Sequence, residues 1–110
     1  MTAFEIAKEA SVMVGLRYSD EEIKSVGLTL LNIVLMEMGL PRLLSADDKP
    51  LLPTDSYTYT LMLGVAKYLS AGIGDARNEE AFGKEYRREL GRLKGSVTLV
   101  RNNGPRGEGC

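Results

Sequence analysis

Hydrophobic residues near the start of the chain recur at helical spacing and lie between clear start and stop signals. Thr2 and Glu5 have the spacing of a capping box, and Gly15 is a residue type that commonly ends a helix. The apolar stripe behind the box consists of Ile6, Ala10 and Met13. The pattern therefore predicts a helix over residues 3–14.

A second capping box, formed by Ser19 and Glu22, opens a longer apolar stretch, and Gly39 provides its C-cap. The expected helix covers residues 20–38. Its main stripe is Ile23, Val26, Leu30, Val34 and Met38, and from position 28 onward other apolar residues occupy most of the remaining circumference. A helix that is apolar nearly all round has to be buried on more than one side. Either it is the central helix of the core, or another subunit covers one of its faces.

Residues 40–53 form a connection that carries three prolines and the leucine pairs Leu43-Leu44 and Leu51-Leu52. Solvated linkers rarely carry so many leucines, so we expect this loop to lie against the core or against a partner. If the loop and the preceding helix contact another subunit, the candidate interface residues are Leu28, Leu31, Leu35, Met36, Leu43 and Leu44.

Two further helices are predicted over residues 56–71 and 76–94. We expect Thr54 or Asp55 to cap the first and Asp75 to cap the second, while Gly64 lets a neighbouring helix approach closely. The first helix has the apolar stripe Tyr57, Leu61, Val65, Tyr68 and Leu69. The second has the stripe Phe82, Tyr86, Leu90 and Leu93, and its opposite face is charged.

The last fifteen residues differ in character from the rest of the chain. The run SVTLV favours extended backbone, and RNNGPRGEGC is rich in Gly, Pro and Asn. We therefore expect an all-α domain over residues 1–95, built as a compact bundle of about four helices. Residues 96–110 are expected to form an extended or disordered tail, β-prone enough to pair with a strand of another chain.

The composition argues against catalysis. The chain has no histidine, the side chain that most readily moves protons near neutral pH, and its single cysteine is the terminal Cys110. Zinc sites built on histidines or clustered cysteines are excluded, as is an internal disulfide. The acids Asp47-Asp48 and Glu79-Glu80 are adjacent pairs, which do not converge on one site. We expect no enzymatic activity, no metal and no cofactor.

The net charge of −1 gives no global field that would attract nucleic acid or a membrane. Residues 1–55 carry nine acids and five bases, a net −4, whereas residues 56–110 carry six acids and nine bases, a net +3. The most apolar run, VGLTLLNIVLMEMGL, is too short to span a bilayer and contains Asn32 and Glu37. The N-terminus has acids where a signal peptide has bases, so we expect a cytosolic protein or a particle assembled in the cytosol.

Four segments in residues 23–94 together resemble a known family. They are the helix end LLNIVLMEMGLP, the loop DDKPLLPTDSY, the small-residue helix LMLGVAKYLSAGIGD, and the charged helix EEAFGKEYRREL with its single inward Tyr86. In order and size they are similar to the small head–tail connector, or head-completion adaptor, proteins of tailed bacteriophages. The chain departs from that group in lacking an aromatic residue immediately before Gly64.

The resemblance implies a structural protein of the virion, located at the head–tail junction and assembled in the host cytoplasm. Copies would form a ring of about twelve below the portal protein after DNA packaging. DNA would pass through the lumen without sequence-specific binding, and a tail-side completion or stopper protein would dock on the ring. Because the C-terminal tail of such adaptors engages the portal, the resemblance points to Val97, Leu99, Val100 and Arg101 as portal-binding residues.

Two alternatives remain open. The first is a small helical regulatory or DNA-binding protein that places the basic residues of the last helix and tail on phosphates, with an affinity that falls steeply with salt. Those residues are Arg77, Lys84, Arg87, Arg88, Arg92 and Lys94, and glutamates lie among them at spacings that allow internal ion pairs. The second is a helical interaction domain whose partner the sequence does not identify.

Overall fold

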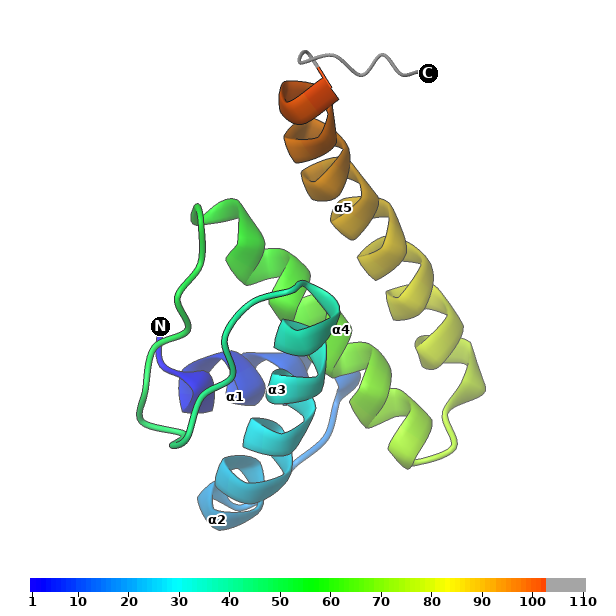
Figure 1. The fold of residues 1–110 in the computed structure, drawn as a ribbon. Coiled ribbons are helices and arrows are strands. Elements are labelled where there is room, and N and C mark those ends of the chain that lie inside the picture. The colour runs from blue at the N-terminus through cyan, green and yellow to red at the C-terminus, as the bar shows by residue number, and fades with distance from the viewer. Residues whose placement is uncertain (103–110) are drawn as a thin grey trace.

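The computed structural model describes the backbone of residues 1–102 and the side chains of residues 1–94. Its elements, shown in Figure 1, are α1 (Ala3–Val14), α2 (Asp20–Glu22), η1 (Ile23–Gly27), α3 (Leu28–Glu37), α4 (Ser56–Gly72) and α5 (Ala76–Asn102). Because α2, η1 and α3 follow one another without a break, they make one long helix over residues 20–37.

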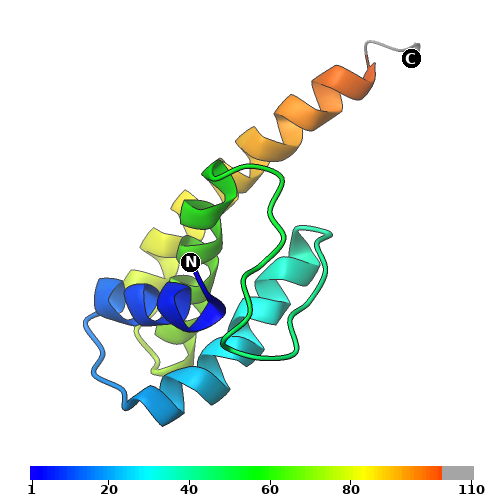
Figure 2. The same cartoon turned by 90° about the vertical axis from the view of Figure 1, so that its left-hand side faces the viewer.

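Helix α4 lies at the centre of the fold. It packs against α1, α3 and α5, and α5 runs back along it after the short turn at residues 73–75 (Figures 1 and 2). The residues of α4 that are buried are Thr60, Leu61, Leu63, Gly64, Val65, Ala66, Leu69 and Ser70. Helix α4, and not the helix over residues 20–37, is therefore the central helix of the fold, although Leu31, Val34 and Leu35 of the latter are fully buried in the core.

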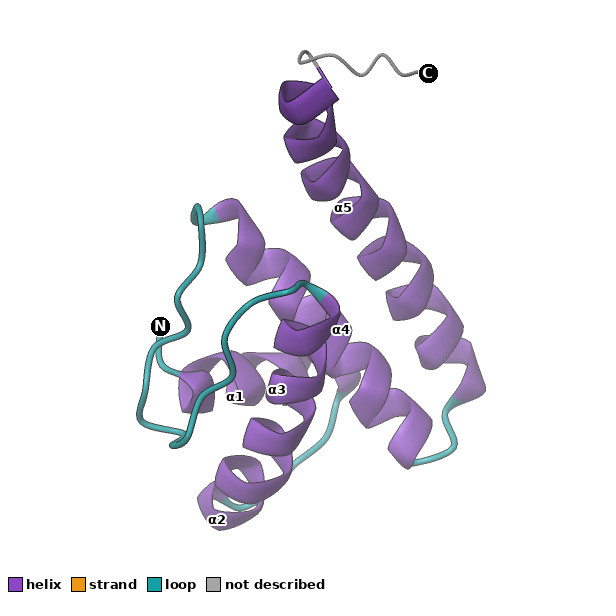
Figure 3. Cartoon of the chain, viewed as in Figure 1, coloured by secondary structure: helices purple, strands orange, loops and turns teal. Residues whose placement is uncertain are grey.

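The all-α fold of about four helices is confirmed, since residues 1–102 contain four continuous helices and no strand (Figure 3). The predicted ends of the first three helices agree with the observed ones to within one residue. These ends were predictable because local side-chain and backbone groups determine them.

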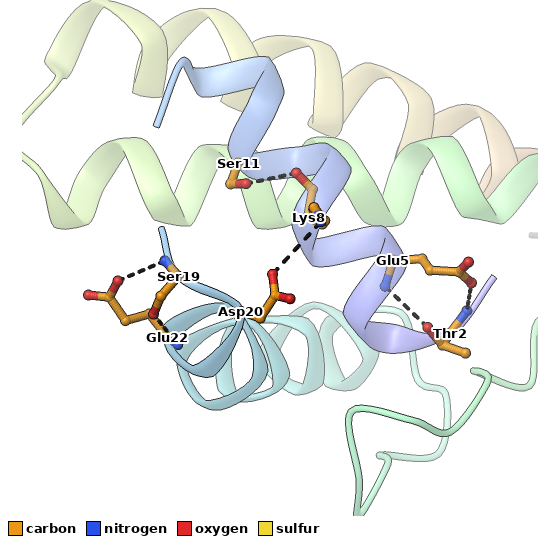
Figure 4. Close-up of polar contacts among 7 residues, drawn as sticks. All are labelled: Thr2, Glu5, Lys8, Ser11, Ser19, Asp20 and Glu22. Atoms are coloured by element: carbon orange, nitrogen blue, oxygen red, sulfur yellow. Dashed lines mark hydrogen bonds and ion pairs between the residues drawn. The ribbon is translucent and has the colours of Figure 1, made fainter. Parts of the chain in front are cut away.

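Both predicted capping boxes are formed (Figure 4). The Glu5 backbone N–H donates to Thr2 Oγ1 over 3.2 Å, and the Thr2 N–H donates to Glu5 Oε1 over 2.7 Å. This last hydrogen bond lowers the pKa of Glu5 below its ordinary value. In the second box, the Glu22 N–H donates to Ser19 Oγ over 3.2 Å, and the Ser19 N–H donates to Glu22 Oε1 over 2.9 Å. Each box satisfies backbone donors that a helix start otherwise leaves without a partner.

The long helix changes to a π turn where α1 crosses it. At Gly27, the last residue of η1, an added Cβ would lie 2.5 Å from the Cβ of Ala7 in α1. Only glycine fits such a close approach, so Gly27 sets the distance between the two helices. The π turn inserts its extra residue at this crossing.

Gly64 has the predicted role in helix packing. An added Cβ there would lie 2.7 Å from Val34 Cγ1 in α3 and 3.0 Å from Tyr86 Cε1 in α5. Helices α3 and α5 therefore both press against the same point of α4. Tyr86, expected to point inward, is 3% exposed.

The caps of the two later helices differ from each other. Asp75 caps α5 as predicted, because its Oδ1 accepts from the Asn78 N–H at 3.1 Å. Asp55 precedes α4 but has helical backbone angles and makes no side-chain capping bond. The backbone carbonyl of Thr54 instead accepts from the Tyr57 N–H at 3.2 Å. A turn formed by the backbone alone therefore starts α4, and the prediction of a side-chain cap is wrong.

Helix α5 continues beyond its predicted end at Gly95, and the structure describes it as far as Asn102. Residues 96–102, expected to be extended, are therefore helical. Adding a residue to an existing helix gains one hydrogen bond at little cost, whereas glycine opposes it by only about 1 kcal/mol. The rest of the expected tail, residues 103–110, lies outside the described residues, and the domain boundary at residue 95 stays a prediction.

Candidate interaction surfaces

An open groove runs along the outer face of α3. It has a volume of about 470 Å³ and is lined by Thr29, Asn32, Ile33, Met36, Gly39, Leu40 and Arg42. Met36 is an apolar residue, yet 72% of its surface is exposed, whereas its neighbours Val34 and Leu35 are fully buried. We call these seven residues the α3 groove. It is an apolar surface that the chain does not cover with its own described elements.

The second wall of the groove is the loop after α3, and Asn32 holds it in place. The Asn32 side chain donates from Nδ2 to the Leu43 carbonyl at 2.9 Å and accepts from the Leu43 N–H at 2.7 Å. This pair of bonds places the Leu43 side chain in the core, at 9% exposed, and leaves Leu44 84% exposed. The loop therefore lies against the core, as one of the two expectations for it stated.

Of the six candidate interface residues, some are buried in the core of the monomer and others are exposed. Leu31 and Leu35 are fully buried, and Leu43 is buried as well. These three belong to the core of the monomer, so the prediction that they lie at a subunit interface is wrong. Leu28 is half-buried against the same core. Periodicity identified an excess of apolar residues correctly, but it could not show that α1 and α4 cover more than one side of α3.

Met36 and Leu44 are the two candidates that remain accessible. Met36 lines the groove from α3, and Leu44 follows Leu43 on the loop that Asn32 fixes to α3. Leu51, further along the same loop, is 70% exposed. An open groove with an exposed apolar side chain in its lining is typical of a surface that binds another protein.

A polar cluster around Glu37 joins three helices and was not predicted from the sequence. The Glu37 carboxylate, at the end of α3, accepts from the hydroxyl of Tyr68 in α4 and from that of Tyr86 in α5, the latter at 2.7 Å. Its backbone carbonyl accepts from Lys94 Nζ at 3.2 Å. Glu37 thus ties the end of α3 to both neighbouring helices.

The Glu37 cluster keeps its two tyrosines protonated. The hydrogen bond to Glu37, helped by burial, raises the pKa of Tyr68 to about 12. Burial, followed by the same kind of hydrogen bond, raises the pKa of Tyr86 well above its ordinary value. The Lys67 ammonium lies 4.7 Å from the ring centre of Tyr68 and 5.9 Å from that of Tyr86. The two protonated tyrosines donate to the Glu37 carboxylate and so join α3 to α4 and α5.

The charged face of α5 is partly neutralised by its own residues. Arg88 pairs with Glu85 and Glu89, and Arg92 pairs with Glu89. Lys94 is directed to the Glu37 carbonyl. Exposed pairs of this type contribute little to stability, but they reduce the positive charge that α5 presents to a polyanion.

The predicted portal-binding residues, Val97, Leu99, Val100 and Arg101, are on the C-terminal end of α5. Their side chains are outside the part of the chain whose side chains are described, so their assignment stays a prediction. The backbone places all four on a helix and not on an extended strand.

Among the described residues, no group of three or more His, Cys, Asp or Glu side chains could hold a metal ion. Within the same part of the chain, no helix has the length and apolar character needed to cross a membrane. Comparison with protein-family models, curated proteins and solved structures finds no match for this chain.

Proposed function

We propose that the chain is a head–tail connector protein of a tailed bacteriophage, which assembles as a ring below the portal protein and forms the platform for tail attachment. The observation that carries this proposal is the α3 groove, an open groove in whose lining Met36 is 72% exposed. Residues 23–94, which contain the groove, are also those in which the sequence resembles this family.

The groove supports a protein that works as one of several identical copies. Soluble monomers rarely leave contiguous apolar surface exposed unless a partner covers it. In a ring, each copy presents its groove to the next copy, so every groove is covered when the ring closes. A ring would thus remove from water the apolar surface that the described residues of one copy leave open.

The length of α5 supports a contact beyond the helical body. α5 has 27 residues and its antiparallel neighbour α4 has 17. The excess corresponds to roughly 15 Å of helix at 1.5 Å per residue. In Figures 1 and 2 the C-terminal end of α5 projects past all the other elements. A projecting end of this kind is suited to reaching the portal, the role that the resemblance gives to this part of the chain.

Truncation tests the proposed role of α5. Deleting residues 96–110 should leave the helical circular dichroism and unfolding cooperativity of the body intact and should abolish binding to a cognate portal. Deleting residues 103–110 alone is the matched control, because it retains Val97 to Arg101 and should keep portal binding. Loss of the whole fold in the longer deletion would contradict the role of this segment as an extension of the body.

A DNA-binding function is the second candidate, because Arg77, Lys84 and Arg87 are exposed on α5 and join none of the ion pairs among the described residues. It predicts binding to duplex DNA that weakens steeply as salt rises. A connector, whose lumen only has to let DNA pass, should show little binding to free DNA at physiological salt. Fluorescence anisotropy with a labelled duplex over a salt series separates the two.

A further inference from the structure

The α3 groove contains a single charged residue. Arg42 lies among otherwise apolar or uncharged residues in its lining. Within the described part of the chain, Arg42 belongs to none of the ion pairs, which join Lys8 to Asp20 and the arginines 88 and 92 to glutamates of α5. A surface that covers the groove should therefore offer an apolar side chain together with a carboxylate for Arg42.

The outer face of α1 offers this combination. Val12 is an exposed apolar side chain, 65% accessible, and Glu9 lies three residues before it. Residues three apart are neighbours on one helix face. Glu9 is exposed and forms no ion pair with any described residue, whereas the adjacent Lys8 already pairs with Asp20 at 3.8 Å.

The two surfaces belong to different sides of the chain. The buried face of α1, which includes Ile6 and Ala10, packs toward α4, so Val12 and Glu9 face away from the body. Figure 2 shows α1 on the left of the fold and α3 on the right. Leu44 and Leu51 are more exposed than Val12, but they lie on the same loop as Leu40 and Arg42, which line the groove. That loop already contributes residues to the accepting surface.

We infer that the α3 groove of one copy binds the outer face of α1 of a second copy, with Val12 against Ile33 and Met36 and the Glu9 carboxylate opposite Arg42. The contact joins two different surfaces, so it is heterologous and leaves each copy with one free groove and one free α1 face. Repetition of such a contact generates a ring or a filament. The inference rests on the proposed function, for which it names the contact between neighbouring subunits.

Disulfide trapping between two single-cysteine chains tests the contact directly. In a Cys110→Ser background, one chain carries Met36→Cys and the other Val12→Cys. When the two chains are mixed with an added oxidant, we expect a disulfide-linked heterodimer as the main product. The control replaces the second chain with Tyr59→Cys, a 51% exposed position on α4, and should give little heterodimer. Equal trapping of both pairs, or none of the first, would overturn the inference.

Charge reversal tests the ionic part of the contact. Glu9→Arg and Arg42→Glu, each alone, should raise the dissociation constant of self-association by about threefold to tenfold, and combining them in one chain should restore much of it. Glu80→Arg, an exposed reversal on α5, is the control and should have no effect. Sedimentation velocity provides the dissociation constants. Equal and additive losses in the double variant would show that the two residues do not meet.

The two proposals fail in distinguishable ways. Assembly into closed rings without trapping of the Val12–Met36 pair would overturn the inferred contact and leave the connector proposal standing. Trapping of that pair in an assembly that does not bind a portal would uphold the contact and count against the connector function.

Discussion

Two adjacent residues of α3 should respond very differently in stability to the same change. Leu35 is fully buried in the core, and Met36, the next residue, is 72% exposed in the α3 groove. We consider truncation of each to alanine, which removes apolar atoms from a similar place in the chain. The adjacent position makes Met36→Ala a matched control for any general effect of the substitution on the helix.

The expected magnitudes differ severalfold. Truncating a fully buried leucine to alanine costs about 2–5 kcal/mol, the lost transfer free energy plus the cavity it leaves. Truncating an exposed side chain usually changes the free energy of unfolding by no more than about 0.5 kcal/mol. Leu35→Ala should therefore lower the thermal midpoint by roughly 10 °C or more, and Met36→Ala by roughly 4 °C or less.

Thermal and urea unfolding, both followed by far-ultraviolet circular dichroism, measure both variants under conditions where the chain is monomeric. Met36→Asp adds a second readout, because it should leave the monomer folded while weakening self-association in sedimentation velocity. If Met36→Ala destabilises the monomer as much as Leu35→Ala, then the chain itself covers the groove. That result would refute the reasoning behind the proposed subunit contact.

Two further predictions concern the packing around α4. Gly64→Ala should destabilise the monomer by about 1–3 kcal/mol in urea unfolding, because the new Cβ would lie 2.7 Å from Val34 Cγ1; an unchanged midpoint would show that α3 can shift away. Folded Tyr68 and Tyr86 keep their protons to higher pH than unfolded tyrosines, so the stability they contribute is present below about pH 10 and lost as pH rises toward 12. Absorbance titration of Glu37→Gln should show both tyrosines ionising at lower pH than in the parent chain.

Local signals in the sequence predicted the helices well. The capping boxes at Thr2 and Ser19 and the left-handed glycines Gly15 and Gly39 act within a few residues of themselves. Their sequence spacing therefore contains nearly all the information needed to place a helix end. Gly64 was identifiable for a similar reason, since a glycine inside an apolar helical stripe marks a close approach.

The features that the sequence did not reveal depend on contacts between distant residues. Glu37 is 31 residues from Tyr68 and 49 from Tyr86, and nothing in its local pattern distinguishes it from a solvated acid. The assignment of Leu35 to the core and Met36 to the groove depends on where α1 and α4 pack against α3. The helical period gives the angle between two such side chains but not the direction in which the core lies.

The central claim is that the α3 groove exists to be covered by another copy in a closed ring. Native mass spectrometry of the purified chain over a concentration series tests it most directly. The account predicts that the population of a single closed oligomer of about twelve copies rises with protein concentration, and that this oligomer is absent in Met36→Asp. A stable dimer that persists at high concentration would contradict it, because a symmetric pair uses the same surface on both copies and leaves none for a head-to-tail ring.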